Sequence, residues 1–90
     1  MKIYKYDFKF TMFARNGVAE ISLPLGSKVL SIQNQDGELK LWALVDEKEE
    51  LMHTWRYFVF GTGLYFPDKT ELKYLTTVQI DSFVWHIFTE

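Results

Sequence analysis

Apolar and polar residues alternate along most of the chain, which is the period of a β-strand with one covered face. The clearest case is the segment Lys28–Asp46, in which two alternating runs flank the pair Asp36-Gly37. An Asp-Gly pair between two such runs is a strong short-range signal for a β-hairpin. The pattern therefore predicts two antiparallel strands in the middle of the chain.

The same pattern predicts about seven short strands in all, joined mostly by hairpins. Strands that are apolar on two sides need a second layer or a second subunit to cover them. We therefore expect an all-β fold, a compact antiparallel β-sandwich or small barrel with little or no helix, formed by residues 1–90 as a single domain. The predicted strands are Lys2–Phe10, Val18–Leu23, Lys28–Gln35, Glu38–Asp46, His53–Gly61, Leu72–Ile80 and Phe83–Thr89.

Local features refine this prediction. The triplet Arg15-Asn16-Gly17 indicates a turn that joins the first two strands as a hairpin. In the third strand, alternation places Val29 on the face opposite to Leu30 and Ile32. The strand His53–Gly61 is rich in aromatic and β-branched residues, so it is predicted to be buried on much of both faces. The charged run 47–50 is interpreted as a solvated connection, with a helical turn as the alternative.

Composition narrows the kinds of partner. Aromatic residues make up 18% of the chain, which favours a dense aromatic core, and aromatic side chains left exposed would mark an interface or a pocket. The 10 basic residues are scattered and outnumbered by 12 acidic ones, so duplex nucleic acid is not an expected partner. There is no cysteine and no apolar run as long as a signal peptide core or a membrane span. We expect a cytoplasmic protein without membrane association, and a homo-oligomer, most simply a two-fold dimer.

Few residues suggest catalytic chemistry. His53 and His86 have no ligands beside them at the spacing of a metal motif, so a structural role is the preferred interpretation and neither a metal nor a cofactor is expected. The carboxylates of Asp46, Glu47, Glu49 and Glu50 are adjacent in a polar segment, which favours a solvated surface over an acid/base pair. We therefore expect no catalytic residue. An enzyme that acts on a nucleotide through one of the histidines is the least favoured alternative.

Two segments suggest ligand binding. Gly61-Thr62-Gly63 would let backbone amides approach a phosphate, but it lacks the lysine and helix of a phosphate loop, and a turn or bulge is the alternative. Trp55-Arg56-Tyr57 combines aromatic rings with one of the two arginines and could hold a nucleobase and a phosphate, unless these side chains pack in the sheet. The candidate ligand-binding residues are Arg15, Trp42, Trp55, Arg56, Tyr57, Gly61, Thr62, Gly63 and His86.

The segments KIYKY, LSIQNQDGELKLWALVD, FGTG, TTVQ and VWHIF resemble a small family recorded in phage and bacterial genomes as a domain of unknown function. The resemblance spans nearly the whole chain and implies no assigned activity. Leu64-Tyr65-Phe66 departs from the His-containing sequence of the family at this position. The resemblance marks as family features Trp42, Asp46, Gly61, Thr62, Gly63, Gln79, Trp85 and His86.

A phage-like origin favours a protein that binds a host target. We expect a non-enzymatic counter-defence sponge that sequesters a nucleotide-derived immune signal, a cyclic nucleotide or an ADP-ribose derivative, at a subunit interface. Arg15, Arg56, Thr62 and nearby aromatic side chains are the expected contacts. The alternative is an interaction protein that inhibits a host protein or contributes to a phage particle through exposed sheet edges and aromatic rings.

Overall fold

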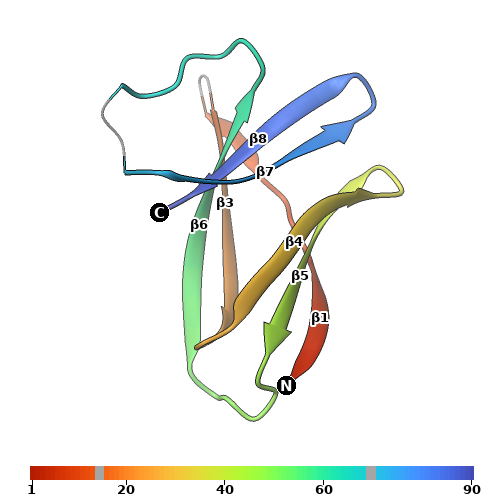
Figure 1. Ribbon diagram of the computed structural model, residues 1–90, viewed down its shortest axis with the longest axis vertical. Coiled ribbons are helices and arrows are strands. Elements are labelled where there is room, and N and C mark those ends of the chain that lie inside the picture. The colour runs from red at the N-terminus through yellow and green to blue at the C-terminus, as the bar shows by residue number, and fades with distance from the viewer. Residues whose placement is uncertain (14–15, 69–70) are drawn as a thin grey trace.

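The computed structural model describes residues 1–13, 16–68 and 71–90, and every regular element in these ranges is a β-strand (Figure 1). A three-stranded sheet has the order β1-β5-β4, and a five-stranded sheet has the order β2-β3-β6-β8-β7. All paired strands are antiparallel, which confirms the predicted all-β fold. No helix among the described residues is long and apolar enough to cross a bilayer. The strands are β1 (Lys2–Asp7), β2 (Thr11–Phe13), β3 (Asn16–Pro24), β4 (Lys28–Gln35), β5 (Glu38–Val45), β6 (Met52–Gly61), β7 (Lys73–Ile80) and β8 (Phe83–Thr89).

The core lies between the two sheets. Every second residue of β5 is buried from Leu39 to Val45, as the period of a strand with one covered face requires. Fully burying an aliphatic side chain contributes about 1.5–3 kcal/mol, so this layer supplies much of the stability of the fold. The largest fully buried side chains are those of Leu23, Ile32, Leu41, Val45, Val59 and Ile87.

The hairpin predicted between Lys2–Phe10 and Val18–Leu23 is wrong. β1 ends at Asp7 and pairs with β5, and the chain then crosses to the other sheet as β2. Asn16 and Gly17 lie inside β3, opposite β2, rather than at the predicted turn, and Arg15 lies outside the described residues. The Phe8 side chain at this crossing is buried, with 3% of its surface exposed.

A β-bulge at Leu30 breaks the alternation predicted for β4. Val29 lies opposite Ala43 and Ser31 lies opposite Trp42, so Leu30 is an extra residue without a partner. The bulge brings Ile32 to the core side together with Val29 and leaves Leu30 exposed. This corrects the prediction that Val29 and Ile32 lie on opposite faces. A shift of one residue inverts every later side chain, and alternation alone does not reveal it.

The two halves of β6 differ in burial, so the prediction that much of both faces is buried applies only to the second half. Residues from Tyr57 to Phe60 are buried or half-buried, whereas residues from Met52 to Arg56 are exposed. The cause is the pairing: β3 runs along almost all of β6, but β8 pairs only with the half from Tyr57 to Gly61. The first half of β6 therefore has one strand neighbour among the described residues.

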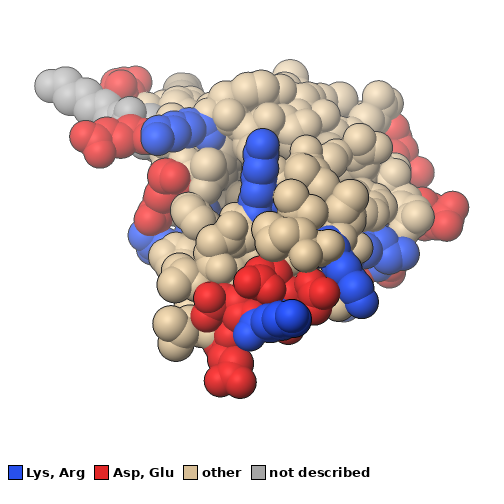
Figure 2. Space-filling view, turned by 60° about the horizontal axis from the view of Figure 1, so that its bottom comes forward, with Lys and Arg blue, Asp and Glu red and all other residues tan. Residues whose placement is uncertain are grey.

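The connection between β5 and β6 is polar and mostly exposed, as predicted. Asp46 Oδ1 accepts a hydrogen bond from the backbone N–H of Lys48 at 3.0 Å, and Glu49 Oε1 accepts one from Leu51 at 3.0 Å. Figure 2 shows acidic side chains gathered around a basic one at the bottom of the view, the end of the molecule to which this connection belongs. We call the segment 46–50 the acidic loop.

Contacts at two edges join the sheets. Where the chain crosses after β1, the backbone N–H of Phe8 donates to the carbonyl oxygen of Leu39 at 3.0 Å. On the other side, Asn34 Nδ2 of β4 donates to the carbonyl oxygen of Gln79 in β7, also at 3.0 Å. The crossing, the start of β5 and the end of β7 consequently surround one space between the sheets.

Leu41→Ala is expected to lower the free energy of unfolding by about 2–5 kcal/mol, because it leaves a cavity in the middle of the core. The matched control is Leu51→Ala, since the Leu51 side chain is 64% exposed, and its effect should stay within about 0.5 kcal/mol. Urea denaturation followed by tryptophan fluorescence measures both. Equal losses for the two variants would contradict the assignment of the core.

Candidate functional site

The end of β6 and the β7–β8 turn enclose a cavity of about 520 Å³, which we call the Thr62 cavity. Its walls are mainly apolar, with hydroxyl groups from Thr62 and Ser82, and its described lining residues include no charged side chain. A mainly apolar pocket with a few fixed polar groups is the usual form of a small-molecule site. The described lining residues are Gly61, Thr62, Leu64, Ser82, Phe83, Val84 and Trp85.

His86 holds the Thr62 side chain in place. Thr62 Oγ1 lies 2.9 Å from His86 Nε2, and Thr77 Oγ1 lies 3.1 Å from His86 Nδ1. The Tyr74 hydroxyl extends this chain, 2.7 Å from Thr77 Oγ1. Because hydroxyls occupy both ring nitrogens, the imidazole plane and the Thr62 rotamer are fixed together. The network thus fixes the rotamer of Thr62, one of the residues that line the cavity.

The glycines beside Thr62 shape the turn and the cavity. A Cβ atom on Gly61 would lie 3.3 Å from Trp85 Cζ3, so glycine leaves room for the indole ring. Gly63 has φ of +88°, a conformation that favours glycine. The backbone N–H of Thr62 donates to Val84, and that of Leu64 donates to Gly61. The Thr62 amide of this segment and the amide of the following Leu64 are therefore engaged in the turn, which favours the interpretation of Gly61-Thr62-Gly63 as a structural turn rather than a phosphate cradle.

An aromatic cluster fixes the segment after Gly63. The ring of Phe66 packs against Phe60 and Phe88, with centroid distances of 4.8 and 4.7 Å. Phe60 lies opposite His86 in the β6–β8 ladder, so the cluster adjoins the histidine network. Aromatic pairs of this kind add about 0.5–1.5 kcal/mol each beyond their buried area. Phe66 thereby anchors the loop whose residue Leu64 lines the Thr62 cavity.

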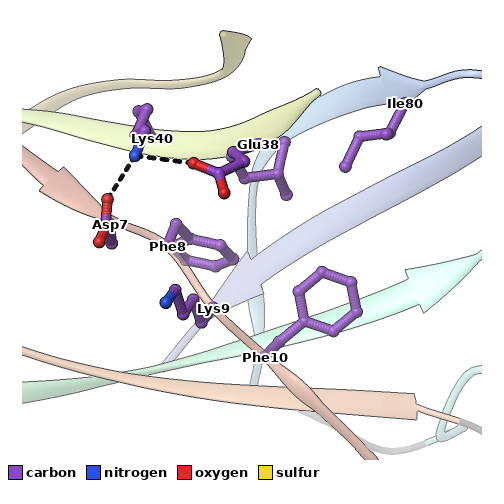
Figure 3. Close-up of a pocket in the computed structure, with 8 residues that line it drawn as sticks. Asp7, Phe8, Lys9, Phe10, Glu38, Lys40 and Ile80 are labelled. Carbon is purple, nitrogen blue, oxygen red and sulfur yellow. Dashed lines mark hydrogen bonds and ion pairs between the residues drawn. The ribbon is translucent and has the colours of Figure 1, made fainter. Parts of the chain in front are cut away.

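A second cavity, of about 370 Å³, lies at the junction of the sheets, and we call it the seam cavity (Figure 3). The crossing segment contributes Phe8 and Phe10, and the end of β7 contributes Ile80. Charged side chains stand at its rim, where Lys40 Nζ bridges Asp7 Oδ1 and Glu38 Oε2. The lining residues are Asp7, Phe8, Lys9, Phe10, Glu38, Leu39, Lys40 and Ile80.

The Lys40 bridge fixes the charges at this rim. The hydrogen bond from Lys40 lowers the pKa of the Asp7 carboxyl below its ordinary value, with the positive charge of Lys40 as a further cause. The same hydrogen bond raises the pKa of the Lys40 ammonium. Both groups therefore stay ionised through the neutral range, and the rim remains charged beside apolar walls.

An edge-to-face contact between Phe10 and Trp85 separates the two cavities. Their ring centroids are 5.3 Å apart at an interplanar angle of 65°. Phe10 lines the seam cavity, and Trp85 lines the Thr62 cavity. The sequence offers no local signal for this arrangement, because the two residues belong to segments 75 positions apart (85 minus 10) that no turn motif connects.

The structure divides the sequence-predicted binding residues among separate places. Gly61, Thr62 and His86 come together, with Gly63 in the adjoining turn. Trp55 and Tyr57 line a different cavity of about 280 Å³ between β4 and β6. Burial raises the pKa of the Tyr57 phenol, as expected for a core side chain.

The remaining predicted residues lie apart from these cavities. Arg56 forms an ion pair with Glu90 and lies over the ring of Phe58, 5.7 Å from its centroid. Trp42 points to the outer face of β5, between buried neighbours. Arg15 lies outside the described residues. Sequence reasoning did not include Thr77, Tyr74 or the seam cavity, because the strand register, and not any local motif, brings them to these places.

Comparisons with known proteins give one match. A family model described as a domain of unknown function, DUF7352, matches residues 1–90. No curated protein and no solved structure matches the chain. The function must therefore be argued from the geometry of the cavities.

Asp7→Asn is expected to flatten the pH dependence of stability at the acid end. The pKa of Asp7 is depressed in the folded protein, so its ion pair stabilises the fold above the unfolded pKa of about 4 and is lost as the pH falls through the lower folded value. The urea midpoints of wild type and variant, measured between pH 6 and pH 2, should converge at the acid end. A constant difference across this range would contradict the assignment.

Proposed function

We propose that this chain, which belongs to the DUF7352 family because the family model matches residues 1–90, is a non-enzymatic binding protein. The Thr62 cavity is the proposed site. The observation that carries the proposal is the mainly apolar cavity lined by Trp85, Phe83 and Thr62, together with the hydrogen bond by which His86 holds the Thr62 hydroxyl. An oriented hydrogen-bonding group next to aromatic surface is suited to a planar ligand group with polar edges.

A nucleobase fits this description, so we propose a nucleotide-derived immune signal as the ligand, a cyclic nucleotide or an ADP-ribose derivative. The base would lie against the apolar wall and its edge would meet the Thr62 hydroxyl. The described lining residues supply no cation for a phosphate. Arg56 is paired with Glu90 and lies five residues before Gly61, about 17 Å along the strand. Phosphates would therefore lie at the mouth of the cavity, where a second subunit of a homo-oligomer would supply their counter-charge.

The surroundings of His86 support binding over catalysis. The distance from Thr62 Oγ1 to His86 Nε2, 2.9 Å, would suit proton transfer, but the other nitrogen contacts the hydroxyl of Thr77 and not a carboxylate. A hydroxyl orients the ring without stabilising a positive charge on it as an ionised carboxylate would. The biological setting that we propose is the cytoplasm of a host cell in which a phage-encoded protein sequesters the signal intact.

The test is to incubate the purified protein with nucleotide extracts of infected and defence-activated cells, wash it, denature it and identify the released molecules by mass spectrometry. Thr62→Val should lower the affinity for the released nucleotide about tenfold, because the variant loses one hydrogen bond worth about 1–1.5 kcal/mol. Thr54→Val is the matched control, since Thr54 lies on β6 far from the cavity. Its Oγ1 atom lies 2.7 Å from Ser22 Oγ.

Release of an intact nucleotide together with weaker binding by Thr62→Val would support the sponge. A chemically converted product would instead indicate an enzyme. Release of no nucleotide, or equal affinities for Thr62→Val and Thr54→Val, would contradict the proposed site.

One observation favours a second candidate, an interaction protein that masks a host protein or contributes to a phage particle. β1 is an edge strand of the three-stranded sheet, and only β5 pairs with it among the described residues. Ile3 and Tyr4 on this strand are 60% and 40% exposed. An edge with exposed apolar side chains can accept a strand from another protein.

If this second candidate is correct, the protein should recover one host protein in stoichiometric amount from a lysate, and Ile3→Asp should abolish recovery. The substitution places a charge on the exposed edge without disturbing the core. Leu25→Asp is the control, since Leu25 is 48% exposed and lies after the end of β3. Equal recovery by the two variants would exclude the β1 edge as the interface.

A further inference from the structure

The seam cavity combines apolar walls with a rim of two carboxylates, Asp7 and Glu38, and two ammonium groups, Lys9 and Lys40. Phe8 and Phe10 of the crossing segment and Ile80 of β7 form the apolar part (Figure 3). At the rim, Asp7 and Glu38 share a single ammonium group, that of Lys40. A ligand for this cavity must therefore satisfy carboxylates and aromatic rings together.

The exposures of the three charged side chains show which of them can take a ligand. The Lys40 side chain is only 16% exposed and already bridges two carboxylates, whereas those of Asp7 and Glu38 are 60% and 70% exposed. Lys40 contacts one oxygen of each carboxylate, Oδ1 of Asp7 and Oε2 of Glu38. Glu38 is the more weakly held partner, at 3.3 Å. Glu38 is thus the group best placed to accept a hydrogen bond from a ligand.

The remaining cation at the rim is Lys9. Figure 3 shows its amine directed away from Phe10 and Ile80, toward the side on which Asp7 lies. Lys9 acts on the Asp7 carboxyl by its charge, which contributes to the low pKa of that group. Near Glu38, Phe10 and Ile80, the described lining cation in contact with Glu38 is therefore Lys40, at 3.3 Å, and not Lys9.

We propose that the seam cavity binds an organic cation, an ammonium or guanidinium group on an apolar stem. The cation would accept the exposed carboxylate of Glu38 as its counter-ion and lie near the phenyl rings, whose faces attract positive charge. The apolar stem would cover Phe10 and Ile80. This site is distinct from the Thr62 cavity, because the Phe10–Trp85 contact stands between them.

Three probes with the same phenyl body and different charges test the proposal: 2-phenylethylammonium, phenylacetate and 2-phenylethanol. Each is titrated into the ¹⁵N-labelled protein while the backbone amide resonances are followed by NMR. The ammonium is expected to bind about threefold more tightly than either of the others, the scale of one exposed charge contact. It should shift the resonances of Phe8, Lys9, Phe10, Leu39 and Ile80.

The results that would overturn the proposal are equally specific. Binding of phenylacetate as tightly as the ammonium would show that the cavity does not select positive charge. Shifts centred on Gly61 to Leu64 would place the probe in the Thr62 cavity instead. Absence of saturable shifts with all three probes would show that the seam cavity takes no ligand of this size.

A pair of substitutions identifies the carboxylate. Glu38→Gln keeps the shape of an exposed side chain and removes its charge, so it should weaken binding of 2-phenylethylammonium about threefold and leave that of 2-phenylethanol unchanged. Glu50→Gln in the acidic loop is the control and should change neither. The dispersion of the amide spectrum shows that both variants are folded, and equal affinities for the two variants would contradict the role of Glu38.

Discussion

Of the two edges at which contacts join the sheets, the one where the chain crosses depends on one residue, Phe8. Its backbone N–H donates to Leu39 at the start of β5, and its ring lies edge-on to Tyr57 of β6 at a centroid distance of 5.5 Å. One residue thus connects the three-stranded sheet by its main chain and the five-stranded sheet by its side chain. Phe8 can make both contacts because it lies in the break between β1 and β2. The seam cavity exists because the chain bends here rather than continuing along β1.

The sequence predicted the features that depend on neighbouring residues. The hairpin at Asp36-Gly37 is present, with φ values of +54° and +88° that suit the tight turn expected of this pair. The hairpin of β7 and β8 is also present, and Asp81 in its turn has φ of +53°. The pairing of β1 with β5 could not be predicted, since it depends on burial of Phe8 between layers that are distant in sequence. The bulge at Leu30 leaves no mark in the alternation, because both Leu30 and Ile32 are apolar.

In the candidate sites, too, residues adjacent in sequence could be identified, whereas contacts between distant segments could not. Trp55, Arg56 and Tyr57 are adjacent in sequence, yet successive residues of a strand point to opposite faces, so Trp55 and Tyr57 line a cavity from which Arg56 points away. Thr62 and His86 are 24 residues apart and form a hydrogen bond because the register places Phe60 opposite His86. Residue types therefore indicated candidates for a site, while the register decided which of these residues come together.

The position of the acidic loop has a practical consequence. β5 runs from the seam cavity to this loop, and β6 runs from the loop to the Thr62 cavity, a strand of 10 residues that spans about 30 Å. Electrostatic screening at physiological salt acts over about 8 Å, so the charges of the loop hardly change the potential in either cavity. The loop is consequently a natural point of attachment. A fluorophore or a surface linker fixed there would leave both cavities open to solution.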